Sequence, residues 1–168
     1  DAFFSKLPKT ELADVVVFIG ELSGMWRGFT HLKDRYIKRV KPQPLALNAC
    51  ILSDAFGFGI GKMAEMCDLE YNTLRSTQED FVRIETICAA NDHVSNFIKA
   101  MPIFEIWNLL DEKVLADADG QKIGSSNQTI QSRHSRKFFG KGCGISIYSL
   151  VANFVAVNAR NLGLNEYE

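Results

Sequence analysis

The sequence is poor in the features that mark several large classes of protein. Its four cysteines form no CxxC pair, so neither a zinc ribbon nor a dithiol redox motif is present. No apolar run is long enough to span a membrane, and no secretory signal peptide is visible. Thiols scattered in this way are typical of a reducing, cytoplasmic compartment.

The chain also lacks a strong charge excess of either sign. Its formal net charge is −1 over 168 residues, so bulk charge indicates no partner. The hydrophobic fraction of 46% and the charged fraction of 23% are typical of a globular chain with an apolar core. Local charge is uneven, because no Asp or Glu occurs between residues 120 and 165, whereas cations continue through that stretch. A local partner for this stretch is therefore possible on charge grounds alone.

The periodicity of apolar residues divides the chain near residue 110. Before it, helical spacing predicts helices over residues 11–24, 45–56, 62–67 and 77–100, with Thr10 capping the first and a Ser76–Glu79 capping box starting the last. After it, strand-like alternation predicts strands over 113–118, 144–152 and 154–160. Sequential strands with tight connections favour an antiparallel meander. The predicted fold class is α+β, with a mainly helical N-terminal region followed by antiparallel strands.

A carboxylate next to a basic loop is the most suggestive constellation. Asp119-Gly120 is predicted to end the first strand, where an acid can bind a divalent cation and glycine permits a tight turn. The loop that follows carries five basic or imidazole side chains: Arg133, His134, Arg136, Lys137 and Lys141. Metal-assisted phosphoryl transfer on nucleic acid needs acids for the metal and cations for phosphates. The residues alone support equally a solvated loop beside a core sheet.

Several segments, in the same order along the chain, resemble the Tn3-family transposases. They are Gly28–Leu32, Leu52–Ala55 followed by Gly59 and Lys62–Glu65, Tyr71–Leu74 followed by Arg83 and Glu85-Thr86, Ala118–Lys122, and Lys137–Gly142 followed by Gly144 and Tyr148. Each motif is modest by itself. Their colinear order over about residues 7–154 makes the resemblance specific.

The resemblance implies a fold, a reaction and a set of site residues. Residues 1–110 would be a helical scaffold, and residues 111–168 would begin an RNase H-like catalytic domain of the DDE type. Asp119 would be the first acid of the triad and a ligand of Mg²⁺ or Mn²⁺, for cleavage and strand transfer of DNA. The basic residues at 133–141 would contact transposon terminal inverted repeats or target DNA. The full-length protein would be a bacterial, nucleoid-associated homodimer without membrane attachment.

Three points in the resemblance leave alternatives open. Asn153 stands where the family usually has Asp, and Asp117 competes with Asp119 for the role of the triad acid. The family's second Asp and its Glu are expected beyond residue 168, so the chain by itself is expected to be inactive. The rival interpretations are a relative that binds DNA without cutting it, and a helical interaction module with a structural sheet. The last rival predicts a buried or ion-paired Asp119 on a different face from the basic loop.

Overall fold

The structure, a computed structural model, describes residues 9–33, 41–110, 113–153 and 155–163. The chain divides into two compact units, a helical unit over residues 1–98 and a sheet unit over residues 99–168. Helices followed by an antiparallel sheet confirm the predicted α+β class. The scaffold and catalytic domain boundary expected near residue 110 stays a prediction. Within the described residues, no helix has the length and apolar character needed to cross a membrane.

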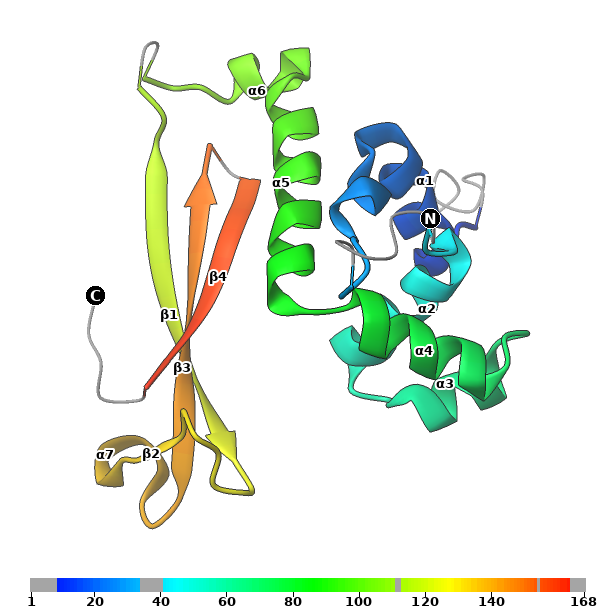
Figure 1. The fold of residues 1–168 in the computed structure, drawn as a ribbon. Coiled ribbons are helices and arrows are strands. Elements are labelled where there is room, and N and C mark those ends of the chain that lie inside the picture. Colours follow the sequence, from blue (N-terminus) through cyan, green and yellow to red (C-terminus); the bar gives the residue numbers. More distant parts are fainter. Residues whose placement is uncertain (1–8, 34–40, 111–112, 154, 164–168) are drawn as a thin grey trace. The chain divides into compact units, whose positions relative to one another are not determined.

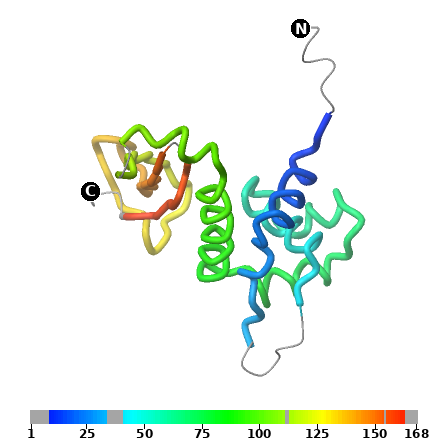
Figure 2. Tube along the Cα trace, turned by 90° about the horizontal axis from the view of Figure 1, so that it is seen from above, coloured from blue at the N-terminus to red at the C-terminus, as the bar shows by residue number. Residues whose placement is uncertain are grey.

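The helical unit is built around one buried helix, α2. Its helices are α1 (Leu12–Ser23), the short 3-10 helix η2 (Met25–Gly28), α2 (Pro44–Phe56), α3 (Ile60–Met66), α4 (Tyr71–Phe81) and α5 (Ile84–Lys99). Pro44 occupies the first turn of α2, where its missing N–H is not needed, and Gly57 ends the helix in the left-handed conformation. Figure 1 and Figure 2 both show α1 (blue) beside α2 (cyan), in agreement with their contacts.

Two sides of α2 pack into two adjoining apolar clusters. Ala46, Ala49 and Cys50 pack with Met63 of α3 and Leu74 of α4. Leu47, on another side of the helix, packs with the second cluster, which contains Phe29, Phe81 and Ala90. Burial of these side chains is the main force that holds the helices together.

Two segments of the Tn3 resemblance meet in this unit. The guanidinium of Arg83 donates to the Thr30 carbonyl oxygen at 2.7 Å and to its hydroxyl oxygen at 2.9 Å. His31 is buried, packs edge-on against Phe81, and has its Nε2 3.6 Å from a carboxylate oxygen of Asp80. The segment from Phe29 to His31 therefore has a structural role, since it ties η2 to the junction of α4 and α5.

The long helix predicted over residues 77–100 is wrong. The chain forms α4 and α5 instead, with an extended residue, Val82, between them. The Thr86 hydroxyl donates to the Phe81 carbonyl oxygen and accepts the Arg83 N–H, which stabilises the break. Ser76 lies inside α4 and donates to the Thr73 carbonyl oxygen, so the capping box is absent. The predicted cap at Thr10 is also wrong, because Glu11 precedes α1 without a side-chain cap bond.

In the sheet unit, β3 (Cys143–Ala152) is the central strand. It pairs antiparallel with β1 (Ala116–Ser125) along one edge, and with β2 (Arg133–His134) and β4 (Val155–Gly163) along the other. The predicted meander is confirmed, with β2 as an additional short strand. Figure 1 shows α6 (Pro102–Ile106) and α7 (Arg136–Phe139) at opposite ends of the sheet.

Candidate functional site

Asp119 lies in the middle of β1, and the prediction that its strand ends there is wrong. Asp119 pairs with Ser149 and Gly120 with Tyr148, within an unbroken ladder of ten residue pairs. Gly120 is needed because the Tyr148 ring lies close to its backbone, and not because the chain turns there. A Cβ atom at residue 120 would lie 2.7 Å from the Tyr148 ring, closer than packing permits. Asp-Gly alone favours a turn, and the ladder to β3 overrides that local preference.

Strand alternation gives the sheet two different faces. Side chains of Asp117, Asp119 and Gln121 share one face with Ile147 and Ser149, because directly paired residues point to the same side. We name this the acidic face. The opposite, basic face carries Gly120 and Lys122 of β1, Tyr148 of β3 and, paired with it, Arg160 of β4.

Both aspartates of β1 are available to a ligand. Asp117 and Asp119 are two residues apart, so their Cα atoms are separated by roughly 6.6 Å on the same face. Both side chains are exposed, and neither carboxylate has a hydrogen bond or ion pair among the described residues. The expectation of a buried or ion-paired Asp119, one of the two that the helical-module interpretation makes, is therefore not met. The sheet register does not distinguish which of the two would be the triad acid.

Carboxylate oxygens match the ligand preference of Mg²⁺, which usually takes one or two carboxylates and keeps several waters. Asp119 fits that requirement as a single ligand. Two-metal chemistry requires more acids than β1 supplies. No group of three or more acidic, His or Cys side chains suited to a metal occurs within residues 9–33, 41–110, 113–153 and 155–163. That Asp119 belongs to a metal site therefore stays a prediction.

Asn153 fixes the chain at the start of the acid-bearing strand. Its backbone N–H donates to the Leu115 carbonyl oxygen at 2.8 Å, and its side-chain oxygen accepts the Leu115 N–H at 3.0 Å. Its amide nitrogen donates to the Asn108 side-chain oxygen at 3.2 Å. Asn153 is buried and has a φ of 44°, a conformation that asparagine tolerates better than most residues. An Asp here would keep the acceptor and lose the donor, which gives the departure noted in the sequence a structural meaning.

The basic loop packs on the basic face, away from Asp119. The Phe139 ring of α7 covers Gly124 and Gly144, where a Cβ atom at residue 144 would come within 2.3 Å of the ring. Lys122 reaches the same helix, with its Nζ 4.6 Å from the centre of the Phe138 ring, and the Lys137 Nζ is 5.1 Å from it. The expectation that Asp119 and the loop lie side by side is wrong for α7.

The other basic residues divide between the two faces. Arg133 pairs with Gly144, which places it on the basic face, and its guanidinium donates to the Ile130 and Ser132 carbonyl oxygens. His134 pairs with Cys143 on the acidic face. Cys143 is opposite Ser125, six residues from Asp119, so His134 is roughly 20 Å along the strand from the acid. Arg136 and Lys141 are exposed. The structure thus does not bring His134 to the acid.

Sequence analysis missed three residues of the basic face. Lys122, Tyr148 and Arg160 are two cations and an aromatic ring on one side of the sheet. The charge pattern of the sequence could have indicated Lys122 and Arg160, because both belong to the acid-free stretch after Gly120. Their common face depends on the pairing register, which single-strand alternation does not fix.

The fold and the exposed acid on its first strand fit the class of protein that the motifs indicated, a DDE transposase. A family model described as the Tn3 transposase DDE domain matches residues 14–168. This chain belongs to that family. The match includes most of the helical unit as well as the sheet.

Curated relatives agree with the family. The chain is similar to the transposase for transposon Tn2501 of Escherichia coli, with 27% identity over 91% of the chain and 15% of the relative. It is similar to the gamma-delta transposase of Escherichia coli K12, with 25% identity over 88% of the chain and 14% of the relative. The transposase for Tn501 of Pseudomonas aeruginosa is 28% identical over 88% of the chain and 14% of its own length. The chain thus spans about one seventh of these relatives. No solved structure matches it significantly.

Proposed function

We propose that this chain is the part of a Tn3-family transposase that carries Asp119, the first acid of the DDE triad. The full-length protein would catalyse metal-dependent cleavage and strand transfer of DNA at transposon ends. The observation that carries the proposal is an exposed carboxylate without a hydrogen bond or ion pair in the described part of the chain, on the first strand of a sheet in a chain of this family. The transposase names of the curated relatives support the DNA substrate.

In this proposal Asp119 is a ligand of Mg²⁺ or Mn²⁺, and the metal supplies Lewis-acid activation of the attacking hydroxyl and of the phosphate. The chain's own residues keep the carboxylate in place. The ladder to β3 and the Asn153 contacts to Leu115 fix β1, and the Gly120–Tyr148 contact holds the strand close to β3. Because two-metal chemistry needs more carboxylates than β1 supplies, the proposal requires further acids to complete the site.

The basic face is proposed to contact the phosphate backbone of transposon-end or target DNA. Lys122 and Lys137 both lie against the Phe138 ring and have no ion pair among the described residues, so two ammonium groups close together remain uncompensated. Arg160, Arg133, Arg136 and Lys141 extend the positive charge, and His134 contributes from the acidic face. Such a surface attracts phosphate by charge and releases counterions on binding. A homodimer associated with the nucleoid remains part of the proposal.

The catalytic part is tested in the full-length transposase that contains this chain. Asp119→Asn should lower strand cleavage at least about a hundredfold, since metal-assisted charge stabilisation contributes several kcal/mol. Asp117→Asn is the matched control, with the same charge change on the same face two residues away, and should retain activity. The reverse result would assign the triad role to Asp117. Full activity in both variants would refute the catalytic proposal.

The DNA contact is tested on the 168-residue chain by fluorescence anisotropy with a labelled duplex at several salt concentrations. Arg136→Gln with Lys137→Gln should weaken binding and reduce the slope of log affinity against log salt by about one unit for each lost phosphate contact. Lys62→Gln with Lys99→Gln removes the same charge from helical positions and should leave the slope unchanged. Equal slopes in both double variants would refute a specific basic face.

One observation favours a second candidate, a relative that binds DNA without cutting it. Asp119 and α7 are on opposite faces of the sheet, so the acid and the helix-borne cations are not adjacent. This candidate predicts normal DNA binding together with no effect of Asp119→Asn on any DNA product. The two assays above therefore separate it from the catalytic proposal.

A further inference from the structure

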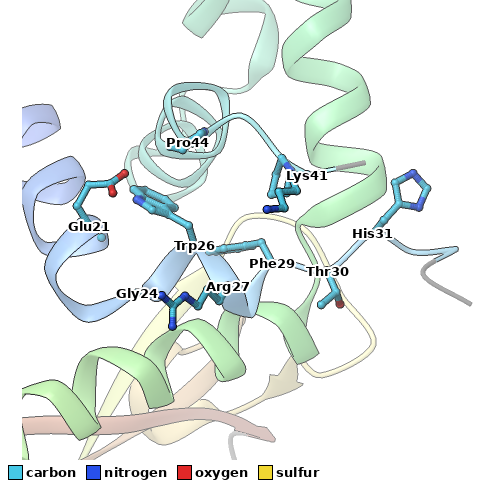
Figure 3. Close-up of a pocket in the computed structure, with 11 residues that line it drawn as sticks. Glu21, Gly24, Trp26, Arg27, Phe29, Thr30, His31, Lys41 and Pro44 are labelled. Carbon is cyan, nitrogen blue, oxygen red and sulfur yellow. The ribbon is translucent and has the colours of Figure 1, made fainter. Parts of the chain in front are cut away.

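A cavity of about 530 Å³ lies in the helical unit. Its lining comes from the end of α1, from η2 and the segment after it, and from the segment that leads into α2. The side chains that matter for its chemistry are Glu21, Trp26, Arg27, Phe29, Lys41 and Pro44 (Figure 3). Its volume is in the range of small-molecule sites, which runs from about 300 to 1,000 Å³.

Close contacts at two glycines hold the aromatic wall in position. A Cβ atom at Gly20 would lie 2.3 Å from the Trp26 ring, so the indole rests directly on the backbone of α1. A Cβ atom at Gly28 would lie 2.5 Å from the Ala90 backbone nitrogen, so η2 is pressed against α5. Between them, Gly24 reverses the chain with a φ of 71°. The indole is therefore fixed by backbone packing on both sides of η2.

The cavity combines aromatic surface with positive charge. Trp26 is partly exposed, Phe29 is buried behind it, and their ring centres are 6.4 Å apart. Arg27 and Lys41 have no ion pair among the described residues, and the Arg27 side chain lies along Gly24. Figure 3 shows Glu21 and the Trp26 indole on one side of the cavity and Lys41 on the other, with the His31 ring turned away.

One donor in the cavity wall lacks an acceptor. The Trp26 Nε1–H is buried and has no hydrogen-bond partner among the described residues. A buried N–H without a partner costs free energy, and this nitrogen lies on the edge of the indole that packs against the Gly20 backbone, so a ligand in the cavity would reach the ring face and not this donor. Glu21 offers the complementary group, a carboxylate that can accept a hydrogen bond from an amino or imino N–H.

We propose that this cavity binds one unpaired nucleotide of a DNA strand. The base would stack on the Trp26 indole, and its phosphate would contact Lys41, while Arg27 beside Gly24 adds positive charge to the cavity. An isolated phosphate does not need an aromatic wall, and an apolar ligand does not need two cations. Proteins that hold single strands combine these two features, with stacking rings beside cations. The inference rests on DNA as the partner in the proposed function, and it adds a site for an extruded or single-stranded residue.

The test uses Trp26 as its own reporter. Trp107→Phe removes the other tryptophan, so the fluorescence of the full 168-residue chain then reports on Trp26 alone. Titration with a 5′-mononucleotide and with a 12-residue single strand should quench the signal in a saturable way. Lys41→Gln should weaken the mononucleotide roughly tenfold or more, since it removes a charge-assisted hydrogen bond. Lys62→Gln is the matched control and should have no effect.

Each outcome decides the proposal. Quenching by mononucleotide that excess inorganic phosphate does not reproduce supports a base-plus-phosphate site. Quenching by inorganic phosphate alone, or equal weakening by Lys41→Gln and Lys62→Gln, overturns it. A silent Trp26 while DNA binding is seen by anisotropy overturns the cavity site and leaves the proposed function standing. A responding Trp26 with no effect of Arg136→Gln and Lys137→Gln supports the cavity and refutes the basic-face contact.

Discussion

Each of the two units of the chain is stabilised by a different kind of interaction. In the helical unit the buried side chains are mostly apolar, and they include Leu47, Leu74 and Phe81. In the described part of the sheet unit the buried residues are Ser132, Gly144, Ser146 and Asn153, and every apolar side chain there is at least partly exposed. The helical unit thus rests on hydrophobic burial, whereas the sheet unit rests on its ladder and on polar contacts. In the exposed sheet the acids and cations of β1 lie at least partly open to solvent.

The largest expected effect tests the helical side of this comparison. Leu47 is fully buried in the cluster that α2 shares with Phe29 and Phe81, so Leu47→Ala should lower the free energy of unfolding by about 2–5 kcal/mol. Leu150→Ala in the sheet, where the side chain is 42% exposed, should cost less than about 1 kcal/mol. Chemical denaturation followed by circular dichroism measures both. Equal losses would contradict the comparison.

A smaller effect tests whether polar contacts hold the sheet. Asn153→Ala removes the side-chain bonds to Leu115 and Asn108, and should cost about 1–3 kcal/mol. Asn153→Gly also removes the side-chain amide, but glycine adopts the positive φ without strain. Comparing it with Asn153→Ala therefore distinguishes the loss of the hydrogen bonds from backbone strain. Asn153→Asp, which introduces the residue that the Tn3 resemblance leads one to expect at this position, should keep the bond to Leu115. Amide hydrogen exchange at Leu115 is the direct measurement, and unchanged protection in the alanine variant would rule out the proposed role.

The smallest effect is confined to alkaline pH. Burial raises the pKa of the Cys50 thiol to about 11, with the Asp54 charge as a lesser cause, and the thiol donates to the Leu74 carbonyl oxygen. The folded state therefore keeps the neutral thiol, while the unfolded chain ionises near pH 9. Stability from this group is complete below pH 9 and declines as pH rises toward 11, by about 1 kcal/mol at pH 10. The difference in unfolding free energy between the native chain and Cys50→Ala should shrink accordingly.

The same burial predicts a reactivity order for the thiols. At pH 8 an alkylating reagent should modify the exposed Cys88 first and the buried Cys50 last, because the thiolate is the reactive form and access is required. Mass spectrometry of digested samples over time gives the order. Early modification of Cys50 would show that the α2 cluster opens more easily than its packing indicates.

The sequence patterns predicted which helices and strands form better than they predicted where these elements begin and end. The helical spacing of apolar residues located α2 because that signal is local to the helix. The break between α4 and α5 was missed because it depends on the Thr86 hydroxyl, whose partners become visible only when the chain has turned. The extent of β1 was missed because Asp119-Gly120 favours a turn locally, and pairing with a strand about thirty residues later overrides it.

The sequence patterns named the residues of the candidate site, whose roles stay a prediction, and they did not give the arrangement of these residues. Asp119 is exposed as a ligand should be, and Arg133, Lys137 and their neighbours form a positive surface. The sequence could not show that the packing of Phe139 on Gly144 carries α7 to the other side of the sheet. The local sequence patterns around Phe139 and Gly144 do not indicate that these two residues are in contact.

Asp119 and Lys122 are three residues apart on one continuous strand, and this odd spacing limits how the length of the segment between them can vary in the family. Because side chains alternate along a strand, an odd spacing by itself places the Asp119 carboxylate and the Lys122 ammonium on opposite faces of the sheet, whatever packs around them. Inserting or deleting one residue between them would bring the two charges onto a common side, and would at the same time turn over every side chain beyond the change. Substitutions in this stretch, Gly120 apart, therefore leave the two faces as they are, whereas changes in its length do not.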